Sequence, residues 1–263
     1  MSNTVYSNFV LENKLTDLLN TKLNTRSLMK IDSSLNATPG IIKNINTYSY
    51  TGAVETLAQG VKNTTRGAVS YTTSQYTVAL AQQVFDYFDE EIMQDPEVLQ
   101  MGMNGASTLM VNDMNVKYFA ELAKATLSQT YPKNGKISYD TGVDAIALMN
   151  LEDEAGLFLI IGTDLKADIR KDVDFKSANQ GEIIHNGQIG NIAGVPVIVS
   201  KLVPTAGAYL ATSDAVTLFT KKDSEVEQER DGEARKNTII MRKVNLVALT
   251  DATKVVRITK ATA

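Results

Sequence analysis

Few residues in this chain have the types and spacing that catalysis or metal binding requires. His185 is the only histidine and cysteine is absent. A Ser-His-Asp triad would therefore have to use His185, and thiolate metal sites are excluded. No serine stands in the sequence context of an activated nucleophile. We interpret His185 as an ordinary loop residue and expect neither enzyme activity nor a cofactor.

A cluster of acidic residues is the other candidate for chemistry. Its members, close together in the sequence, are Asp86, Asp89, Glu90 and Glu91. Carboxylates can bind a cation or act as an acid–base pair. No histidine, glycine turn or amide ligand accompanies them, and acidic residues near a helix start interact favourably with the helix dipole. We therefore favour a helix start and expect no metal site.

Nucleic-acid binding has one weak signal, the spacing of Gly187 and Gly190, which matches a Gly-x-x-Gly clamp for RNA. Basic residues are missing around it, and the formal net charge of the chain is -4. A chain with no surplus of positive charge is not expected to bind duplex nucleic acid tightly or sequence-specifically. No long uncharged apolar run is present, so we also expect no transmembrane helix and no membrane partner.

The glycine-rich stretch at residues 181–202 contains no nucleophile, base or metal cluster. Its glycines are Gly181, Gly187, Gly190 and Gly194. The β-branched run that follows, residues 195–199, is interrupted only by Pro196. Glycine permits sharp turns, and such an apolar run is typical of a buried strand with the proline near its start or on an edge. The stretch predicts short strands joined by tight turns.

Three segments have helical periodicity. The longest covers residues 104–129 and has an apolar line at steps of three or four, with a charged line on the opposite side. The apolar line consists of Met110, Met114, Tyr118, Leu122 and Ala125. The charged line consists of Asp113, Lys117, Glu121 and Lys124. Asp140 or Thr141 can cap a second helix, which precedes an apolar strand at residues 157–161. Leucines at residues 8–23 predict an N-terminal helix, docked either on its own domain or on a neighbouring subunit.

Residues 41–50 and 68–80 are rich in Thr and Tyr, which favour strands. Gly52, Gly60 and Gly67 lie between the two segments. The pattern predicts a long two-stranded hairpin with a loose tip. Two strands alone cannot bury a core, so the hairpin must lie on a neighbouring subunit or fold over its own domain.

A dense run of charge of both signs covers residues 221–236. Such a run usually forms a solvated loop or face, although the mixed signs could also pair between symmetry-related copies. Two strands, residues 237–249 and 254–258, are expected to end the chain. Because helices and strands alternate without a regular βαβ pattern, the predicted fold class is α+β.

The order of these parts resembles a known family. A long hairpin, the acidic junction, a long helix, a capped helix with an apolar strand, and the motif Gly187-x-Ile-Gly190-x-Ile-x-Gly194-Val-Pro-Val-Ile-Val-Ser follow one another. The charged run and the final strands complete the series. The chain is similar to the major capsid proteins of tailed double-stranded-DNA bacteriophages, which have the Hong Kong 97-type head fold.

The resemblance implies a division of the chain into four parts. Residues 1–38 would be an N-terminal arm and residues 39–81 an extended β-hairpin, the E-loop, that lies over the adjacent subunit. Residues 82–136 and 212–243 would form a peripheral domain, with the spine helix at residues 104–129. Residues 137–211 and 244–263 would form an axial domain, which packs around five-fold and six-fold axes.

The resemblance also implies partners. Copies of the chain would assemble as hexamers and pentamers into an icosahedral virion shell, in the host bacterial cytoplasm, around double-stranded DNA bound without sequence specificity. A separate scaffolding protein, a portal and decoration proteins would be further partners. Contacts between subunits are expected at the charged run and the hairpin, namely at Glu225, Glu227, Glu229, Arg230, Asp231, Arg235, Gly52, Gly60 and Gly67.

Two other functions remain open from the sequence. An encapsulin-type bacterial nanocompartment has a similar fold and would enclose a cargo enzyme in place of DNA. A monomeric α+β enzyme or binding module would instead have a concave pocket and would not assemble.

Overall fold

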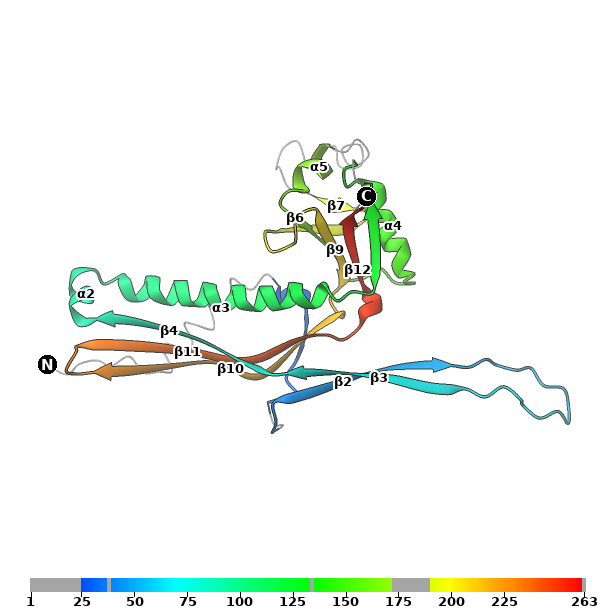
Figure 1. Ribbon diagram of the computed structural model, residues 1–263, viewed down its shortest axis with the longest axis horizontal. Helices are drawn as coiled ribbons and strands as arrows, with labels where there is room; N and C mark the ends of the chain where they lie inside the picture. Colours follow the sequence, from blue (N-terminus) through cyan, green and yellow to red (C-terminus); the bar gives the residue numbers. More distant parts are fainter. Residues whose placement is uncertain (1–24, 37–38, 133–134, 172–189, 262–263) are drawn as a thin grey trace.

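The computed structural model describes residues 25–36, 39–132, 135–171 and 190–261, and all structural statements below concern these residues. The strands form a two-stranded ribbon, a four-stranded sheet and a six-stranded sheet. Figure 1 shows a long helix lying over the sheet that carries β4, β10 and β11, and a smaller unit of sheet and helices at one end of that helix. The predicted N-terminal helix at residues 8–23, together with His185 and Gly187, lies outside the described residues.

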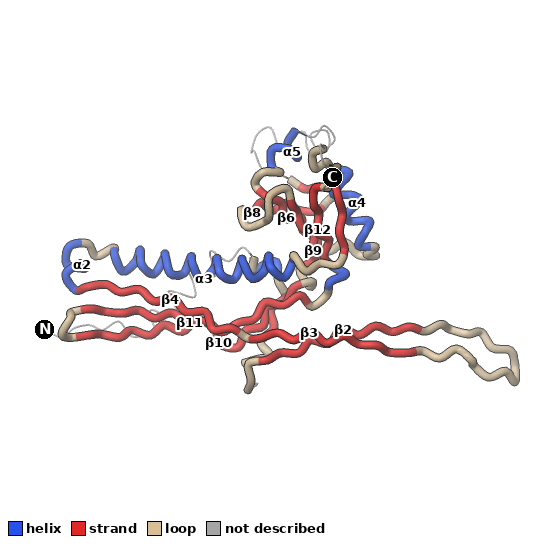
Figure 2. Tube along the Cα trace, in the orientation of Figure 1, coloured by secondary structure: helices blue, strands red, loops and turns tan. Residues whose placement is uncertain are grey.

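The ribbon consists of β2 (Ile42–Thr51) and β3 (Ala68–Thr77). The strands pair antiparallel in one unbroken register, in which Tyr48 is opposite Tyr71. The predicted hairpin is thereby confirmed. β4 (Ala79–Phe88) follows directly but belongs to the four-stranded sheet. In Figure 2 the ribbon continues the strand layer of that sheet and extends away from it.

The four-stranded sheet has the strand order β1-β10-β11-β4. The short strand β1 (Lys30–Asp32), which follows the 3-10 turn η1 (Arg26–Leu28), pairs parallel with β10. β10 (Val216–Asp231) and β11 (Lys236–Leu249) form a long antiparallel hairpin, and β4 pairs antiparallel with the other edge of β11.

Of the two expected forms of the charged run, a solvated loop or a solvated face, the structure shows mainly the second, because residues 221–231 belong to strand β10. Residues of β10 alternate between the two faces of the sheet. Ser224 and Val226 are buried, whereas the glutamates at positions 225, 227 and 229 lie on the opposite face and are not buried. The dense charge concealed this two-residue period in the sequence.

The long helix, α3 (Val98–Leu122), begins and ends earlier than the predicted residues 104–129. It starts shortly after Pro96, and the short helix α2 (Asp89–Gln94) precedes it. Beyond Leu122 the chain turns into β5 (Leu127–Tyr131), which pairs with β12 (Val255–Lys260). Pairing with a strand far along the sequence thus ends the helical segment.

The apolar line of α3 is confirmed, since Met110, Met114, Tyr118 and Leu122 are all buried against the sheet. The expected charged line is confirmed only in part. Asp113 and Lys117 form an exposed ion pair of 2.6 Å, whereas Glu121 is buried and its carboxylate accepts a hydrogen bond from the backbone N–H of Leu249.

The smaller unit contains a six-stranded mixed sheet of order β5-β12-β9-β6-β8-β7. The strands not yet named are β6 (Leu157–Gly162), β7 (Asn191–Ile192), β8 (Val195–Ser200) and β9 (Gly207–Thr212). The helices α4 (Tyr139–Met149) and α5 (Lys166–Lys171) belong to this unit, and the short turn η2 (Ala252–Lys254) leads into β12. The predicted apolar strand is confirmed, since every residue of β6 is buried.

Two local details of this unit bear on the sequence predictions. The cap of α4 is Ser138 and not Asp140 or Thr141: its hydroxyl accepts from the backbone N–H of Thr141 at 3.4 Å. The turn between β7 and β8 places Ala193 and Gly194 at φ 48° and 82°, as a tight turn in the glycine-rich stretch requires. For residues 190–202 the predicted strand–turn–strand pattern is confirmed.

One apolar core joins the two sheets. Its residues come from α3, the inner face of the four-stranded sheet and the near side of the smaller sheet. Phe119 on α3 and Tyr209 on β9 meet with their ring centroids 6.3 Å apart. Within the described residues, no helix is long and apolar enough to span a membrane.

Candidate functional site

The acidic cluster singled out in the sequence does not form a metal site. Among the described residues, no group of three potential His, Cys, Asp or Glu ligands is gathered for a metal ion. Asp89, Glu90 and Glu91 occupy the first turn of α2, as predicted, while Asp86 lies on β4. Asp86, Asp89 and Glu90 instead form ion pairs with basic side chains of the β10–β11 hairpin.

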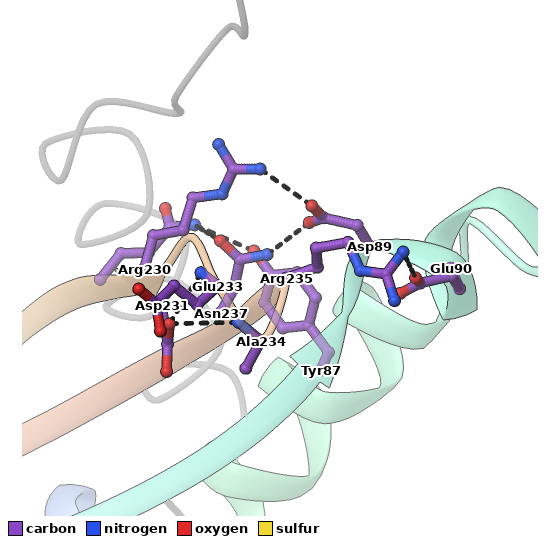
Figure 3. Close-up of polar contacts among 10 residues, drawn as sticks. Tyr87, Asp89, Glu90, Arg230, Asp231, Glu233, Ala234, Arg235 and Asn237 are labelled. Atoms are coloured by element: carbon purple, nitrogen blue, oxygen red, sulfur yellow. Dashed lines mark hydrogen bonds and ion pairs between the residues drawn. The ribbon is translucent and has the colours of Figure 1, made fainter.

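The end of the β10–β11 hairpin is tied to the corner between β4 and α2 (Figure 3). A guanidinium nitrogen of Arg230 lies 2.9 Å from one carboxylate oxygen of Asp89, and the amide of Asn237 donates to the other at 2.7 Å. Arg235 forms an ion pair of 3.0 Å with Glu90. These contacts join two segments that the sequence separates by more than half of the chain.

A second pair of contacts extends this attachment along β4. Lys236 forms an ion pair of 2.7 Å with Asp86, and the hydroxyl of Thr238 donates to the same carboxylate at 2.7 Å. The contacts of Lys236 and Thr238 lower the pKa of Asp86, and those of Asn237 and then Arg230 lower the pKa of Asp89. Both carboxyls are therefore charged at neutral pH and hold the hairpin end to its own subunit.

Most of the charged residues expected at subunit contacts thus have partners within the chain. Besides the two arginines, Glu225 pairs with Lys222 at 2.7 Å and Glu227 pairs with Arg242 at 3.0 Å. The carboxylate of Asp231 accepts from the backbone N–H groups of residues 233 and 234, which closes the hairpin turn. In the part of the chain that the structure describes, Glu229 has no ion-pair partner within 4.0 Å.

The three glycines predicted at the ribbon tip have local structural roles. A Cβ atom at Gly52 would lie 2.8 Å from the hydroxyl oxygen of Tyr50, and one at Gly67 would overlap the same side chain. Gly60 has φ of +86°, a conformation that residues with a Cβ rarely adopt. Gly52 and Gly67 therefore leave space for Tyr50, and Gly60 allows the chain to reverse.

The ribbon has two chemically different faces. Tyr48, Tyr50 and Tyr71 share one face and are 65%, 72% and 66% exposed. The rings of Tyr48 and Tyr71 pack side by side with centroids 6.0 Å apart. The other face carries small hydroxyl side chains at positions 47, 49, 51, 70, 72 and 74. Sequence reasoning did not separate these faces, although the alternation is visible once the register is known.

The base of the ribbon is attached to the body by contacts that the sequence did not indicate. The hydroxyl of Tyr76 lies 3.4 Å from the carbonyl oxygen of Leu249, and the ammonium of Lys124 lies 5.1 Å from the centre of the Tyr76 ring. Lys43 lies over the ring of Phe219 at 5.1 Å. The ribbon is therefore held at its base, whereas most of the side chains beyond the base are exposed.

Comparisons with known proteins agree with this architecture. A sequence profile of the family described as phage capsid protein matches residues 71–258. The major capsid protein of Staphylococcus phage phiMR11 is 26% identical over 250 residues, covering 92% of this chain and 89% of that protein. Among solved structures, the mature capsid of bacteriophage PhiM1 has a TM-score of 0.72 at 10% identity, covering 90% of this chain and 87% of the other.

A virus-like particle from Pyrococcus furiosus is also similar, with a TM-score of 0.63 at 12% identity, covering 97% of this chain and all of the other. At such identities the structural likeness establishes the fold, which is the expected Hong Kong 97-type fold of class α+β. The profile match extends from the ribbon through both sheets to the last strand. The chain belongs to the phage capsid protein family, as a major capsid protein that associates with copies of itself to form the shell of a tailed bacteriophage.

Proposed function

We propose that this capsid protein assembles as hexamers and pentamers into an icosahedral head, and that its ribbon reaches over the adjacent subunit. The observation that carries this proposal is the ribbon itself. Among the described residues, its two ten-residue strands pair only with each other, and most of their side chains are exposed. A two-stranded ribbon gains little burial by itself, so contact with another copy supplies the apolar burial that the isolated subunit lacks.

The same proposal assigns roles to the parts of the chain. Residues 1–38 are the N-terminal arm, and the E-loop is the ribbon from residue 39, taken to end at Val78 because β4 follows it. The four-stranded sheet with α3 is the peripheral domain. The six-stranded sheet with α4 and α5 is the axial domain around five-fold and six-fold axes. One strand, β11, extends past the domain boundary expected at residues 243 and 244.

We propose further that the end of the β10–β11 hairpin contacts its symmetry-related copies at three-fold positions of the shell. Glu229 pairs with Thr238 close to that end of the sheet, and both Glu229 and the turn at residues 231–235 are exposed. Arg230 and Arg235 support this region from within by their pairs with α2. We assign the direct contact to Glu229, which has no ion-pair partner among the described residues, and give the arginines the supporting role.

Further partners follow from the same assembly. A separate scaffolding protein directs shell closure, a portal occupies one vertex, and decoration proteins bind the outer surface. Assembly takes place in the cytoplasm of the bacterial host. The shell encloses double-stranded DNA without sequence-specific contacts, in agreement with a formal net charge of -4 per chain. The protein has a structural role in the capsid shell and performs no catalysis.

Negative-stain electron microscopy of the purified chain, alone and with its scaffolding protein, tests the proposal. Closed shells, or flat rings of five and six subunits, are the expected result. A uniform monomer under all conditions would contradict the proposal and favour a binding module. The contents of shells isolated from cells separate a phage head from an encapsulin-type compartment, because the former holds DNA and the latter a cargo enzyme.

A further inference from the structure

Lys243 is a buried basic residue without an ion-pair partner among the described residues. It lies on the face of β11 that packs under α3, where Met241 and Val247 belong to the apolar core. The carboxylate of Asp223 on β10 attracts its ammonium only from more than 4.0 Å away. A buried charge is unfavourable unless it is paired or hydrogen-bonded. Lys243 therefore marks a place that suits a negatively charged ligand.

Two further cations lie close to Lys243. Lys117 comes from α3, and Arg26 comes from the turn η1. The hydroxyl of Thr25 contacts the side-chain oxygen of Asn115, which holds η1 against α3. Burial lowers the pKa of Lys243, and Arg26 and Lys117 lower it further, as like charges at close range do. Positive potential thus accumulates around the buried ammonium.

An unsatisfied hydrogen-bond acceptor lies two residues further along the same face of β11. Asn245 is 3% exposed, and its side-chain oxygen has no hydrogen-bond partner among the described residues. A buried acceptor without a donor lowers stability. A ligand that brings a donor to Asn245 removes this cost.

A cavity of about 230 Å³ lies beside these groups, between α3, β11 and the junction of β3 with β4. Asn245 and its cross-strand partner Ala79 line it, together with Lys117. Lys243 and its partner Ala81 form the next pair on the same face of the sheet, so Lys243 adjoins the cavity. A water molecule in the liquid takes about 30 Å³, so the cavity has room for a small ion and several waters.

The carboxylates near the cavity are already engaged by other lysines. Glu121 lines the cavity and forms an ion pair of 2.6 Å with Lys124. Asp113 forms an ion pair of the same length with Lys117. Neither acid is left to neutralise Lys243. The site therefore combines an excess of positive charge with an unsatisfied acceptor.

This combination selects among the common anions. The ammonium of Lys243 requires anionic oxygens, whereas the side-chain oxygen of Asn245 requires a donor. An ionised carboxylate, a sulfate ion and a phosphodiester offer acceptors only. Inorganic phosphate near neutral pH is negatively charged and still retains at least one hydroxyl group. Lysine and arginine bind phosphate oxygens by charge-assisted hydrogen bonds, which are stronger than those between neutral groups.

We propose that the cavity between α3, β11 and the β3–β4 junction binds one inorganic phosphate ion. Its charged oxygens accept hydrogen bonds from Lys243 and Lys117, its hydroxyl donates to Asn245, and Arg26 adds electrostatic attraction. Because the ion bridges α3 and β11 at the base of the ribbon, its binding stabilises the packing of these elements within one subunit. The inference goes beyond the proposed assembly function and does not depend on it.

Thermal unfolding of the unassembled wild-type subunit in sodium phosphate and in sodium sulfate, at equal ionic strength and neutral pH, tests the inference. Phosphate should raise the Tm along a saturating curve, by about 2–4 °C once its concentration reaches about five times its Kd. Sulfate strengthens apolar burial in proteins generally and should raise the Tm steadily without saturation. Equal curves in the two salts would overturn the inference, because the site would then select no hydroxyl donor.

Isothermal titration calorimetry with sodium phosphate assigns the binding to the site. Lys243→Met should weaken phosphate binding by about tenfold or more, because it removes a charge-assisted hydrogen bond. Lys243→Gln, which is polar but uncharged, should have the same effect and serves as the second variant if the first does not fold. The matched control is Lys171→Met, which removes the same charge from an exposed position at the end of α5 and should bind phosphate as wild type does.

Two further outcomes would overturn the inference. Equal losses of affinity in Lys171→Met and Lys243→Met would show a general attraction of phosphate to positive charge and no site. A short double-stranded DNA, whose phosphodiester groups carry no hydroxyl, should leave the phosphate titration unchanged, and competition that depends on Lys243 would assign the site to nucleic acid instead. All these measurements use unassembled subunits, so a negative result leaves the proposed assembly function intact, and a failure of assembly leaves the phosphate site intact.

Discussion

Asp89 and Arg230 are separated by 141 residues in the sequence, yet their side chains meet at 2.9 Å between the first turn of α2 and the end of β10. Together with Asn237, they join the hairpin end to the β4–α2 corner inside one subunit. The hairpin end therefore has a defined position before any assembly takes place. A shell benefits from this arrangement, because a preorganised contact loses less conformational entropy on association.

The acid sensitivity of the subunit should depend in part on Asp89. Asn237 and Arg230 hold the pKa of Asp89 below its usual value of 3.8. A carboxyl whose folded pKa is depressed adds stability above the unfolded pKa, and this contribution is lost as pH falls through the folded pKa. We expect Asp89→Asn to have a lower free energy of unfolding than wild type at pH 7. As pH falls below 3.8, the free energy of unfolding should decrease less in Asp89→Asn than in wild type.

Urea denaturation of unassembled subunits from neutral pH down to about pH 3 measures this difference. Arg230→Gln serves as the companion variant, since it removes the arginine that lowers the pKa of Asp89 and keeps the Asp89 carboxyl. Identical pH dependence in Asp89→Asn and wild type would show that the carboxylate contributes nothing to stability.

Charge reversal at two adjacent positions should give two different results. Arg230→Glu places a carboxylate beside Asp89, so we expect a lower Tm of the free subunit and poor assembly. Glu229→Lys breaks no ion pair among the described residues. It should leave the Tm unchanged, reduce shell yield several-fold at about 0.05 M salt, and have little effect at about 0.5 M salt, where exposed charges are screened.

Differential scanning fluorimetry and the yield of shells on a density gradient separate the two effects. Unchanged shell formation by Glu229→Lys at low salt would remove this glutamate from the contact between subunits. A reduced Tm of Glu229→Lys would show instead that its role lies within the subunit.

Removal of the ribbon tip should separate folding from assembly. Thr51 and Ala68 are paired at the end of the ribbon, so residues 52–67 can be replaced by Asn-Gly, which closes a two-residue hairpin. We expect the free energy of unfolding of the subunit to be unchanged and shells to form poorly. A subunit that unfolds after this deletion would show that the tip stabilises its own domain.

The hydroxyl of Tyr118 is a weak point in the core between α3 and the sheet. It is fully buried without a hydrogen-bond partner among the described residues, and burial raises its pKa. Tyr118→Phe removes an unsatisfied polar group and keeps the ring, so the free energy of unfolding should stay the same or rise by up to about 1 kcal/mol. Tyr118→Ala should cost about 3–5 kcal/mol.

Chemical denaturation of the free subunit measures both changes at Tyr118. A loss of more than about 1 kcal/mol in Tyr118→Phe would indicate that the hydroxyl forms a hydrogen bond that stabilises the fold.

Lys243 on β11 is 4% exposed, and no carboxylate of the described residues lies within 4.0 Å of its ammonium. Desolvation lowers its pKa, Asp223 opposes this change, and Arg26 and Lys117 add to it. The folded pKa of Lys243 is therefore below the usual lysine value of 10.5. Between these two pKa values the unfolded state holds more protons than the folded state. The free energy of unfolding should therefore increase as pH rises from the folded pKa toward 10.5.

Lys243→Met should therefore leave the free energy of unfolding at pH 7 unchanged or increased, and should flatten its rise toward high pH. Lys243→Arg is the matched control, because arginine stays charged throughout this range. A loss of stability in Lys243→Met with the same pH profile as wild type would mean that the ammonium has a stabilising partner.

The local pattern of residues was sufficient for several elements. The spacing of Met110, Met114, Tyr118 and Leu122 predicted the buried face of α3, because a helical stripe is a property of adjacent turns. The strand-forming residues around Gly52 and Gly67 predicted the ribbon for a similar local reason. The order of such parts was also enough to indicate the family and its α+β fold.

Element boundaries and the state of individual charges depended on distant segments. Leu127 is opposite Val256 in the smaller sheet, and that pairing ends the helical segment that the sequence extended to residue 129. Glu121 faces the backbone of Leu249 and is buried, although its helical position suggested solvent. Neither effect is visible within one turn or one strand.

In the charged run, the contrast between what the sequence determines and what the tertiary structure decides is clearest. Its composition determined that residues 221–236 carry both signs of charge, but not that they form strands or which partner each charge has. β4 supplies the carboxylate of Asp86 and α2 supplies Asp89 and Glu90 only once the chain has folded β4 onto β11. Ion pairs form where charges come within a few ångströms, and for residues so far apart in the sequence only the tertiary structure decides that distance.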